Sequence, residues 1–423
     1  MKNYHESKIN NPEFWIKKLE EPEKIILNTD RIKEMNKKMF SEINDMTLKK
    51  YIFEINDDSS GYFKGLTLRN FANLNIPAKF CFKKNGKKIK KFNFNDLMDN
   101  CNLDKKLIFK KGITKKRINL RRFPTEFINA EFWNSIHQDF FQETVLSPFE
   151  SFLILQESKD EKWFYIQSNI YPGWIRKKHI ELIDNFIEYE HLLNPESFLR
   201  VVGDYVQTEP NIYVDSGKII KFQMGDKIPL TKNNHQPYTQ YSLNSFKVPM
   251  PVGPKSGKNI VFIKNDNKVS VGNIPFNRKN IVLQSFKLLG ERYGWGGSNN
   301  RRDCSRFVFD IFRCFGIDLP RDCSIQEKIS PFKKIQFDNK NDKYKGKILN
   351  TMSSGDLLFL KGHVMIYLNK IGENHYVIHN GSGFSYNGKN FNVHGVMIMP
   401  LSMSLLKQKT TYTEALTSVL LLC

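Results

Sequence analysis

The chain has 423 residues, 40% of them hydrophobic, and its 65 basic against 44 acidic residues give a net charge of +21. At roughly 150 residues per domain this length predicts about three domains, and the composition supports hydrophobic cores but excludes an integral membrane protein. The positive charge favours anionic partners such as nucleic acid, anionic lipid or cell-envelope polymers.

The N-terminal part contains no apolar signal-peptide region, so no export signal is visible. Residues 12–50 have the apolar spacing of helices, with Asn28, Thr29 and Asp30 as candidate N-caps. The Lys-rich stretch CFKKNGKKIKKF lacks interleaved exposed aromatic residues and a recognisable nucleic-acid-binding motif. We expect a solvated hairpin turn around Asn85-Gly86 there, and no nucleic-acid partner.

Short strand-like runs follow. Between residues 117 and 185 they are separated by turn residues such as Ser158-Lys159-Asp160 and Pro172-Gly173, which predicts a small β-barrel. Residues 197–270 repeat this style and predict a second β-rich unit.

The pattern changes after residue 271. The run NIVLQSFKLLGERYG is helical and ends at Gly290 and Gly294, and a second helix begins near Cys304. A polar excursion over about 331–350 precedes the strand-like runs GDLLFLKGHVMIYLN, HYVIHNGSGF and GVMIMPL. Helices followed by a sheet predict an α+β domain. The apolar tail ALTSVLLLC is far shorter than the roughly 20 residues that span a bilayer, so no transmembrane segment is expected.

The positions of the cysteines distinguish one candidate reactive thiol, Cys304, from the others. The six cysteines form no C-x-x-C pair and no dense framework, so we expect mostly buried thiols, no disulfide scaffold, and no metal or other cofactor. Cys304 differs because Asp303 is a favoured N-cap that places it in the first turn of a helix. The helix dipole there stabilises a thiolate, so we expect a thiol pKa below the roughly 8.5 of free cysteine. Oxidation could join Cys304 to Cys323, but nothing in the sequence places them together.

Glycines flank the Cys304 helix. Gly316 suits its C-terminal cap, and the glycines of the preceding YGWGG loop permit close approach of another backbone.

A reactive thiol needs a base. His363 begins the second of two strand-like runs joined by Lys361-Gly362, which would hold an imidazole at a sheet edge facing a helix N-terminus. His379 could orient that imidazole through its other ring nitrogen. His375, which alternates onto the same side of the same strand, and a carbonyl group are the alternatives.

These motifs occur in one order: YGWGG and RDCS, then GIDLPRD, GDLLFLKGHVMIYL and VIHNGSG. Across about residues 280–400 they resemble the NlpC-type bacterial cell-wall peptidases, a circularly permuted papain-like family. Upstream, LRRFPTE, EKWFYIQSNIYPGWI and FQMGDKIPL are similar to the two bacterial Src-homology-3-type barrels of one branch, and NPEFWIKKLEEPEKIILNTDRIKEMN resembles its N-terminal helical clip. The resemblance implies an α+β fold with a clip over 1–112, barrels over 113–190 and 195–270, and a peptidase domain over 271–423.

The resemblance also implies roles for the motif residues. Cys304 is the implied nucleophile, His363 the base and His379 the polar third member. Asp303 and Ser305 are implied to contact the γ-D-Glu part of the substrate.

Two further residues are implied to line the site: Tyr293, which is similar to a site-lining family tyrosine, and Ser324, on the acyl side. Two departures stand out. Arg306 occupies a position where many relatives have Gly or Ala. The separation of Cys304 and His363 is slightly long, which the polar excursion explains.

The family cleaves the γ-D-glutamyl–diamino-acid (diaminopimelate) bond of peptidoglycan stem peptides. The resemblance therefore implies a monomeric cysteine endopeptidase that forms an acyl-enzyme on these peptides. In barrel-bearing relatives the first barrel closes one end of the cleft, and an acid such as Glu143 or Glu150 could read the substrate amine; the residues leave that choice open. The implied location is the periplasm or cell envelope, with cytoplasmic peptide recycling as the alternative. The rival function is a non-catalytic envelope protein that binds an anionic cell-wall polymer.

Overall fold

The computed structural model describes residues 8–41, 61, 63–83, 85–90, 92–131, 138–183, 192, 195–209, 219–230, 244–249, 260–329, 331–337 and 341–422. These residues form two compact units. The C-terminal unit takes the described residues of 1–42, 273–293 and 300–423, and the barrel unit takes those of 43–272 and 294–299. The predicted clip is thus divided between the two units, and the four-part boundaries stay a prediction. Among the described residues, no helix is long and apolar enough to cross a membrane.

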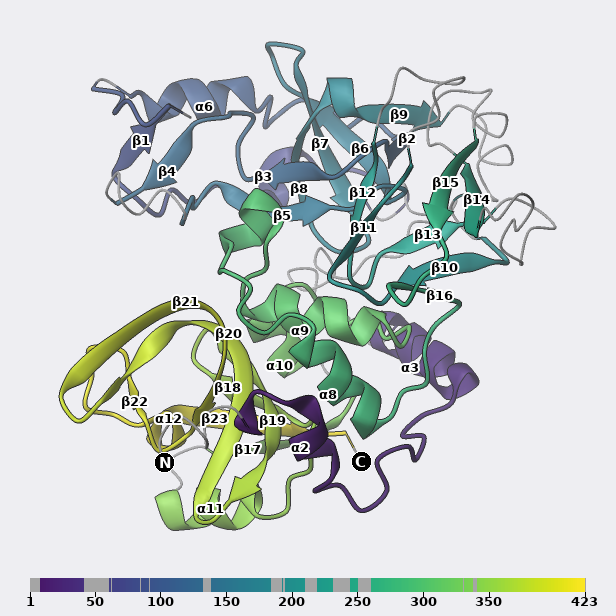
Figure 1. Ribbon diagram of the computed structural model, residues 1–423. Helices are drawn as coiled ribbons and strands as arrows, with labels where there is room; N and C mark the ends of the chain where they lie inside the picture. The colour runs from purple at the N-terminus through teal and green to yellow at the C-terminus, as the bar shows by residue number, and fades with distance from the viewer. Residues whose placement is uncertain are drawn as a thin grey trace. The chain divides into compact units, whose positions relative to one another are not determined.

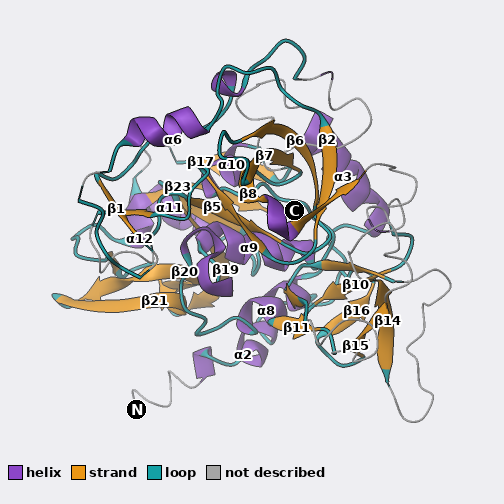
Figure 2. Ribbon diagram, turned by 90° about the horizontal axis from the view of Figure 1, so that it is seen from above, coloured by secondary structure: helices purple, strands orange, loops and turns teal. Residues whose placement is uncertain are grey.

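An antiparallel sheet forms the centre of the C-terminal unit (Figure 1). Its strands lie in the order β17-β23-β18-β19-β20-β21, and β22 pairs with β20. Their bounds are β17 Lys333–Gln336, β18 Leu357–Leu360, β19 His363–Ile371, β20 Asn374–Tyr386, β21 Lys389–Pro400, β22 Ser404–Leu405 and β23 Leu416–Leu421. β20 and β21 make a long hairpin (Figure 2). The predicted strand-like runs correspond to β18 through β21, whereas the apolar tail forms β23, inside the sheet between β17 and β18.

The predicted polar excursion holds regular structure. β17 exposes most of its side chains and exists because its backbone pairs with β23, from Lys333 opposite Leu421 to Gln336 opposite Ser418. A helix follows, capped by Asn341, whose side chain accepts a hydrogen bond from the Tyr344 amide. Tertiary pairing therefore overrides the weak local signal of this segment.

Helices cover the sheet of the C-terminal unit. Their bounds are α2 Pro12–Ile16, α3 Thr29–Ser41, α8 Arg278–Phe286, α9 Cys304–Arg313, α10 Cys323–Lys328, α11 Asp342–Leu349 and α12 Tyr412–Ala415. α9 packs on β19 and β20, α10 packs on α9 and β19, and α8 packs on α9 (Figure 1). The predicted N-terminal helices are α2 and α3, and of the three candidate caps Asn28 accepts the Arg31 amide.

The N-terminal segment is tied to this unit by specific contacts. Trp15 is fully buried and its ring lies 5.5 Å from that of Tyr376 on β20. The Ile26 amide donates to the Phe276 carbonyl, and the Asn36 side chain donates to the Gly316 carbonyl. Segments 8–41 and 273–422 therefore share one core.

In the barrel unit, a seven-stranded antiparallel sheet follows the order β5-β3-β8-β7-β6-β2-β9. Its bounds are β2 Lys110–Thr114, β3 Ile118–Arg121, β5 Gln142–Leu146, β6 Ser151–Glu157, β7 Trp163–Ser168, β8 Pro172–Arg176 and β9 Ile180–Ile183. Trp163 and Trp174 lie in its core, which extends to helix α6 (Phe94–Asn100) and strand β1 (Phe80–Phe82). β1 pairs with β4 (Ile128–Ala130).

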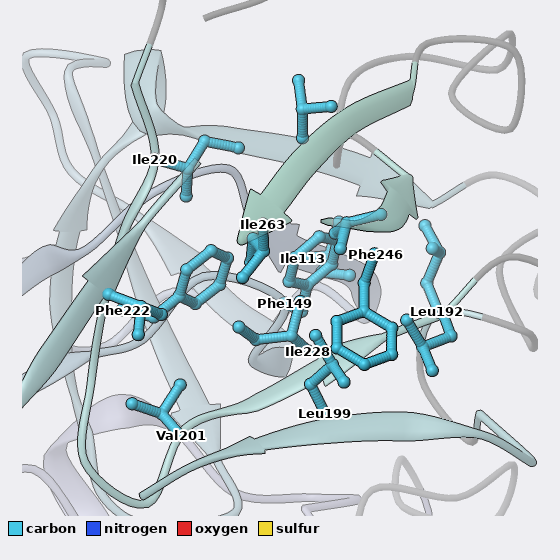
Figure 3. Packing of buried hydrophobic residues seen from close by; sticks show 14 of the residues in the cluster. Ile113, Phe149, Leu192, Leu199, Val201, Ile220, Phe222, Ile228, Phe246 and Ile263 are labelled. Carbon is cyan, nitrogen blue, oxygen red and sulfur yellow. The ribbon is translucent and has the colours of Figure 1, made fainter. Parts of the chain in front are cut away.

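The second β-rich segment consists of small sheets around one apolar core. Its strands are β10 Phe198–Val201, β11 Tyr205–Gln207, β12 Lys221–Gln223, β13 Lys227–Pro229, β14 Ser245–Pro249, β15 Ile260–Lys264 and β16 Val269–Val271. Figure 3 shows Phe149, from the first barrel, among the buried residues of this core. Its ring stacks on that of Phe222 at 6.1 Å, so the two β-rich segments share their packing.

Two glycine positions test the turn predictions. Gly86 has a φ of +86° in a turn closed by Lys83 and Lys87, as predicted. Pro172-Gly173, predicted as a turn, instead begins β8. Glycine is needed there because an added Cβ would lie 2.8 Å from the Arg121 carbonyl oxygen.

The loop before the Cys304 helix also needs its glycines. Gly296 and Gly297 have φ of +55° and +80°, and a Cβ on Gly296 would lie 2.7 Å from the Gln142 carbonyl oxygen. Gln142 Nε2 donates to the Gly296 carbonyl at 3.1 Å. The predicted close backbone approach is confirmed, and its partner is strand β5.

Candidate active site

Helix α9 begins as the sequence predicts. Asp303 is the N-cap, and its Oδ1 accepts the Arg306 amide at 2.8 Å. Cys304 is the first helical residue and is 7% exposed. The apolar stripe is buried, with Phe307, Val308, Ile311 and Phe312 fully covered. Gly316, at a φ of +83°, follows the helix in the left-handed conformation.

The β18–β19 hairpin positions the first imidazole. Lys361 and Gly362 form the turn, with Gly362 at a φ of +76°, and His363 pairs with Leu360 as the first residue of β19. His363 lies close enough to Cys304 to lower the pKa of its thiol, against the larger opposing effects of Cys323 and burial. Packing of α9 on β19 therefore brings thiol and imidazole together.

A second imidazole follows behind the first. His363 Nε2 lies 2.7 Å from His379 Nδ1, and the two rings meet edge to face. His379 is fully buried beside the ring of Tyr412. Burial and then the neighbouring His363 lower the pKa of His379 well below its usual value, so it stays neutral. The rival, His375, bonds Tyr367 Oη at 2.8 Å instead.

The pKa of Cys304 differs from the sequence-based prediction. A hydrogen bond to the Cys323 thiol and burial raise the pKa of Cys304 well above its usual value, although His363 acts in the opposite direction. The prediction of a lowered pKa is therefore wrong for the free site, because the helix start lies in a buried place beside a second thiol. The raised pKa favours the neutral thiol of Cys304 over the thiolate.

A buried arginine organises the residues on either side of Cys304. Arg321 donates to both carboxylate oxygens of Asp303, at 3.0 and 2.5 Å, and to Ser305 Oγ at 2.9 Å. Burial opposes ionisation of Asp303, but Arg321 and the Arg306 amide outweigh it and lower the pKa of Asp303. Asp303 stays ionised, and the predicted substrate contacts of Asp303 and Ser305 remain predictions.

A second buried network explains the departure at residue 306. Arg306 Nε lies 2.6 Å from Asp310 Oδ1, one helical turn on, and Asp310 Oδ2 also accepts from Arg302 at 2.7 Å. Arg302 pairs further with Glu291 at 2.5 Å, and its carbonyl accepts from Asn380 on β20. The arginine thus belongs to a cluster that joins α9 to the sheet.

The remaining predicted site residues lie as follows. Tyr293 is half-buried, and burial together with nearby Cys304 raises the pKa of its phenol, which stays protonated. Ser324 is exposed on α10, one residue after the cysteine that reaches Cys304. Glu143, on β5 of the barrel unit, is largely buried and pairs with Arg122 at 2.6 Å.

Sequence reasoning missed Arg321, and it named Cys323 as an oxidation partner of Cys304 without a reason to place the two together. Arg321 lies inside the quoted motif GIDLPRD, so a signal existed, but the motif does not reveal what the guanidinium contacts. Glu150, the alternative acid, is half-buried after β5, and its amide donates to Thr114 Oγ1. In the part of the chain that the structure describes, no group of three His, Cys, Asp or Glu side chains could hold a metal ion.

Comparison with known proteins gives independent findings. Residues 290–411 match the NlpC/P60 family, and residues 134–176 match the SH3 domain of SH3b1 type. A gamma-D-glutamyl-L-lysine dipeptidyl-peptidase from Bacillus subtilis is 27% identical over 194 residues, which cover 45% of this chain and 51% of that protein. Dipeptidyl-peptidase 6 from Lysinibacillus sphaericus is 33% identical over 92 residues, 22% of this chain and 29% of that one. The chain thus spans about half the length, or less, of these curated relatives.

Solved structures agree in fold. An NlpC/P60 endopeptidase from Photobacterium damselae subsp. piscicida gives a TM-score of 0.69 at 16% identity, over 95% of this chain and 94% of that one. An NlpC/P60 family protein from Bacillus cereus gives 0.50 at 17% identity, over 73% and 98%. The predicted combination of helix and sheet is confirmed, and the C-terminal part of the chain is an NlpC/P60-family domain preceded by an SH3b1-type domain.

Proposed function

We propose that this protein is a cysteine peptidase that hydrolyses the bond between γ-D-glutamate and a diamino acid in peptidoglycan stem peptides. The observation that carries the proposal is the chain of contacts from the Cys304 thiol to the His363 ring and from His363 Nε2 to His379 Nδ1. A nucleophile, a base and an orienting group in that order are the requirement for thiol-based acyl transfer.

The reaction begins with a proton transfer. His363 uses Nε2 toward His379, which leaves its other ring nitrogen to take the Cys304 proton as sulfur attacks the scissile carbonyl carbon. The amide at the start of α9 has no intrahelical acceptor, so it supports the oxyanion that develops. The imidazolium then protonates the departing amine, and the γ-glutamyl acyl group remains on sulfur. Water, deprotonated by His363, releases the acid.

Neutral His379 has a defined part in these steps. When His363 becomes an imidazolium, its Nε2–H needs an acceptor, and His379 Nδ1 lies 2.7 Å away. Burial keeps His379 from binding a second proton, and the tautomer with hydrogen on Nε2 leaves Nδ1 free to accept this bond. This supports a role in orienting the base rather than in moving protons.

The substrate class rests on the family resemblance and on relatives named for a γ-D-glutamyl-L-lysine bond. Diaminopimelate and lysine both present an amine on the L-centre, so both bonds are candidates. Ionised Asp303 and neighbouring Ser305, held by Arg321, supply polar groups beside the nucleophile for the γ-D-Glu part. Such a substrate belongs to the cell envelope or to peptide recycling.

The test is mass spectrometry of products from L-Ala-γ-D-Glu-diaminopimelate, the lysine analogue and whole muropeptides. Wild type should release L-Ala-γ-D-Glu from the free peptides. Cys304→Ala should lose activity on the order of a thousandfold or more. Cys314→Ser, on the same helix but bonded to the Asp310 carbonyl, is the matched control and should stay active. Retention on cell-wall polymer with no cleavage of any γ-D-Glu bond would favour the non-catalytic alternative.

A further inference from the structure

Two cysteine side chains meet at the candidate active site. Cys323 is the first residue of α10, and its thiol lies close enough to that of Cys304 to raise the pKa of Cys304. Cys304 is buried, whereas Cys323 is partly exposed. Both are free thiols. The contact therefore joins the proposed nucleophile to a second sulfur that solvent can reach.

Buried bonds that do not involve sulfur hold this arrangement. Arg321, two residues before Cys323, binds both oxygens of Asp303 and the hydroxyl of Ser305. Gln326 Nε2, one turn further along α10, donates to the Ser305 carbonyl at 3.2 Å. The residues on both sides of Cys304 are thus fixed to residues on both sides of Cys323, so the sulfurs stay together.

The other described cysteines have different surroundings. Cys81 and Cys101 lie in the core of the barrel unit, where burial raises their pKa values to about 11 and about 12. Cys314 donates its thiol to the Asp310 carbonyl at 3.5 Å. Within the described residues, Cys304 and Cys323 are the cysteines placed for a bond to each other.

We propose that Cys323 is a resolving cysteine, which captures peroxide-oxidised Cys304 as a reversible disulfide and so switches the peptidase off. The proposal builds on the proposed function, because the off state is defined by loss of the nucleophile. The oxidant is a hydroperoxide such as hydrogen peroxide.

The chemistry balances in two steps. His363 takes the Cys304 proton, and the sulfur attacks one peroxide oxygen. An S–O bond forms, the O–O bond breaks, and the departing hydroxide takes up a proton as water, so sulfur is oxidised by two electrons and peroxide reduced. The Cys323 sulfur then attacks the sulfenic sulfur, an S–S bond forms, and the S–O oxygen leaves as water with the Cys323 proton. The sulfurs of Cys304 and Cys323 must approach each other to reach the ~2.05 Å of a disulfide. A dithiol reductant restores both thiols by exchange.

Whether Cys323 is present decides which oxidation product forms at Cys304. With Cys323 present, the sulfenic acid is captured before further oxidation. Without it, the sulfenic acid at Cys304 proceeds to sulfinic acid, which dithiols do not reduce.

The experiment compares the full chain with Cys323→Ser and the matched control Cys314→Ser. Each is treated with excess hydrogen peroxide, quenched with catalase, and divided into samples with and without dithiothreitol. Tryptic mapping without reduction follows the peptides of Cys304 and Cys323, and γ-D-glutamyl peptide cleavage is measured relative to each untreated variant.

Wild type and Cys314→Ser should yield one linked peptide pair that lacks two hydrogen atoms, lose activity, and regain nearly all of it with dithiothreitol. Cys323→Ser should give no linked pair, gain two oxygen atoms at Cys304, and recover less than about a tenth of its activity. Sulfinic acid at Cys304 of wild type without a linked pair, or equal recovery in Cys323→Ser, would overturn the proposal. Peptide mapping needs no enzymatic turnover. A linked pair in a chain that cleaves no peptide would therefore refute the proposed function while leaving the disulfide in place.

Discussion

Replacing Arg321 with Met tests whether the buried ion pair holds the start of α9. Arg321 is 2% exposed and donates two hydrogen bonds to Asp303 and one to Ser305. Removing the guanidinium leaves a buried carboxylate without its main counter-charge. Losing one partner of such a pair destabilises by about 3–5 kcal/mol. Met keeps much of the side-chain volume, so the cost comes from charge rather than from a cavity.

The matched control is the double variant Asp303→Asn/Arg321→Met. Asparagine remains a good N-cap, so it can still accept the Arg306 amide that Asp303 accepts at 2.8 Å. No buried charge is then left unpaired. We expect the double variant to recover most of the stability that the single variant loses, although it too should lose activity if Asp303 contacts substrate.

Hydrogen exchange of the α9 amides, followed by mass spectrometry, measures the opening free energy of the C-terminal unit separately from the barrel unit. A loss of about 3–5 kcal/mol corresponds to roughly 150- to 5,000-fold faster exchange when the unit exchanges by opening. Acceleration below about tenfold in Arg321→Met would refute the reasoning. Equal acceleration in the single and double variants would show that the guanidinium matters for packing rather than for charge.

Three further predictions concern the histidines and the acid. His379→Ala should lower kcat on the order of a thousandfold because it removes the acceptor 2.7 Å from the base, whereas His375→Ala should have little effect; the reverse ranking of measured kcat would contradict the assignment. Because the pKa of buried His379 is lowered, the unfolded chain binds more protons than the folded chain below about pH 6.5. The free energy of unfolding should therefore decrease by up to ~1.4 kcal/mol for each pH unit that the pH falls below that value. Urea unfolding near neutral pH and at about pH 5 should show a flatter dependence for His379→Asn, and an unchanged slope would exclude this histidine as its source. If Glu143, now paired with Arg122, reads the substrate amine, wild type should show a higher kcat/KM for free than for N-acetylated peptide, and Glu143→Gln should reduce that preference; comparable wild-type values would mean an open cleft.

Helix caps, apolar periodicity and turn residues were sufficient to predict the parts of the site that local structure determines. Asp303, an apolar stripe and Gly316 specify the limits of α9 from within about 14 residues, since caps and periodicity act locally. Lys361 and Gly362 likewise fix the turn that places His363. The thiol and its imidazole partner were predictable because each lies at the end of such an element.

Features that depend on tertiary packing were not predictable in the same way. The pattern of β20 favoured His379 but left His375 as a rival, and the choice depends on which ring the folded sheet turns toward His363. The Cys304 pKa was predicted in the wrong direction because the sequence shows a helix start but neither its burial nor the approach of Cys323. No local rule reveals that a distant segment will supply a second sulfur.

The sheet of the C-terminal unit has a consequence for biosynthesis. β23, from Leu416 to Leu421, lies between β17 and β18, so the sheet cannot close until the ribosome has released that segment. Helices α2 and α3 are synthesised long before β23 but pack into the same unit, so they cannot complete their packing earlier. The barrel unit consists almost entirely of residues that are synthesised between these two parts. Contacts across such separations slow folding, and waiting apolar surface such as Trp15 is exposed to aggregation. The order of synthesis therefore gives a barrel unit that can fold early, whereas the sheet that carries His363 and His379 stays incomplete until β23 has been made.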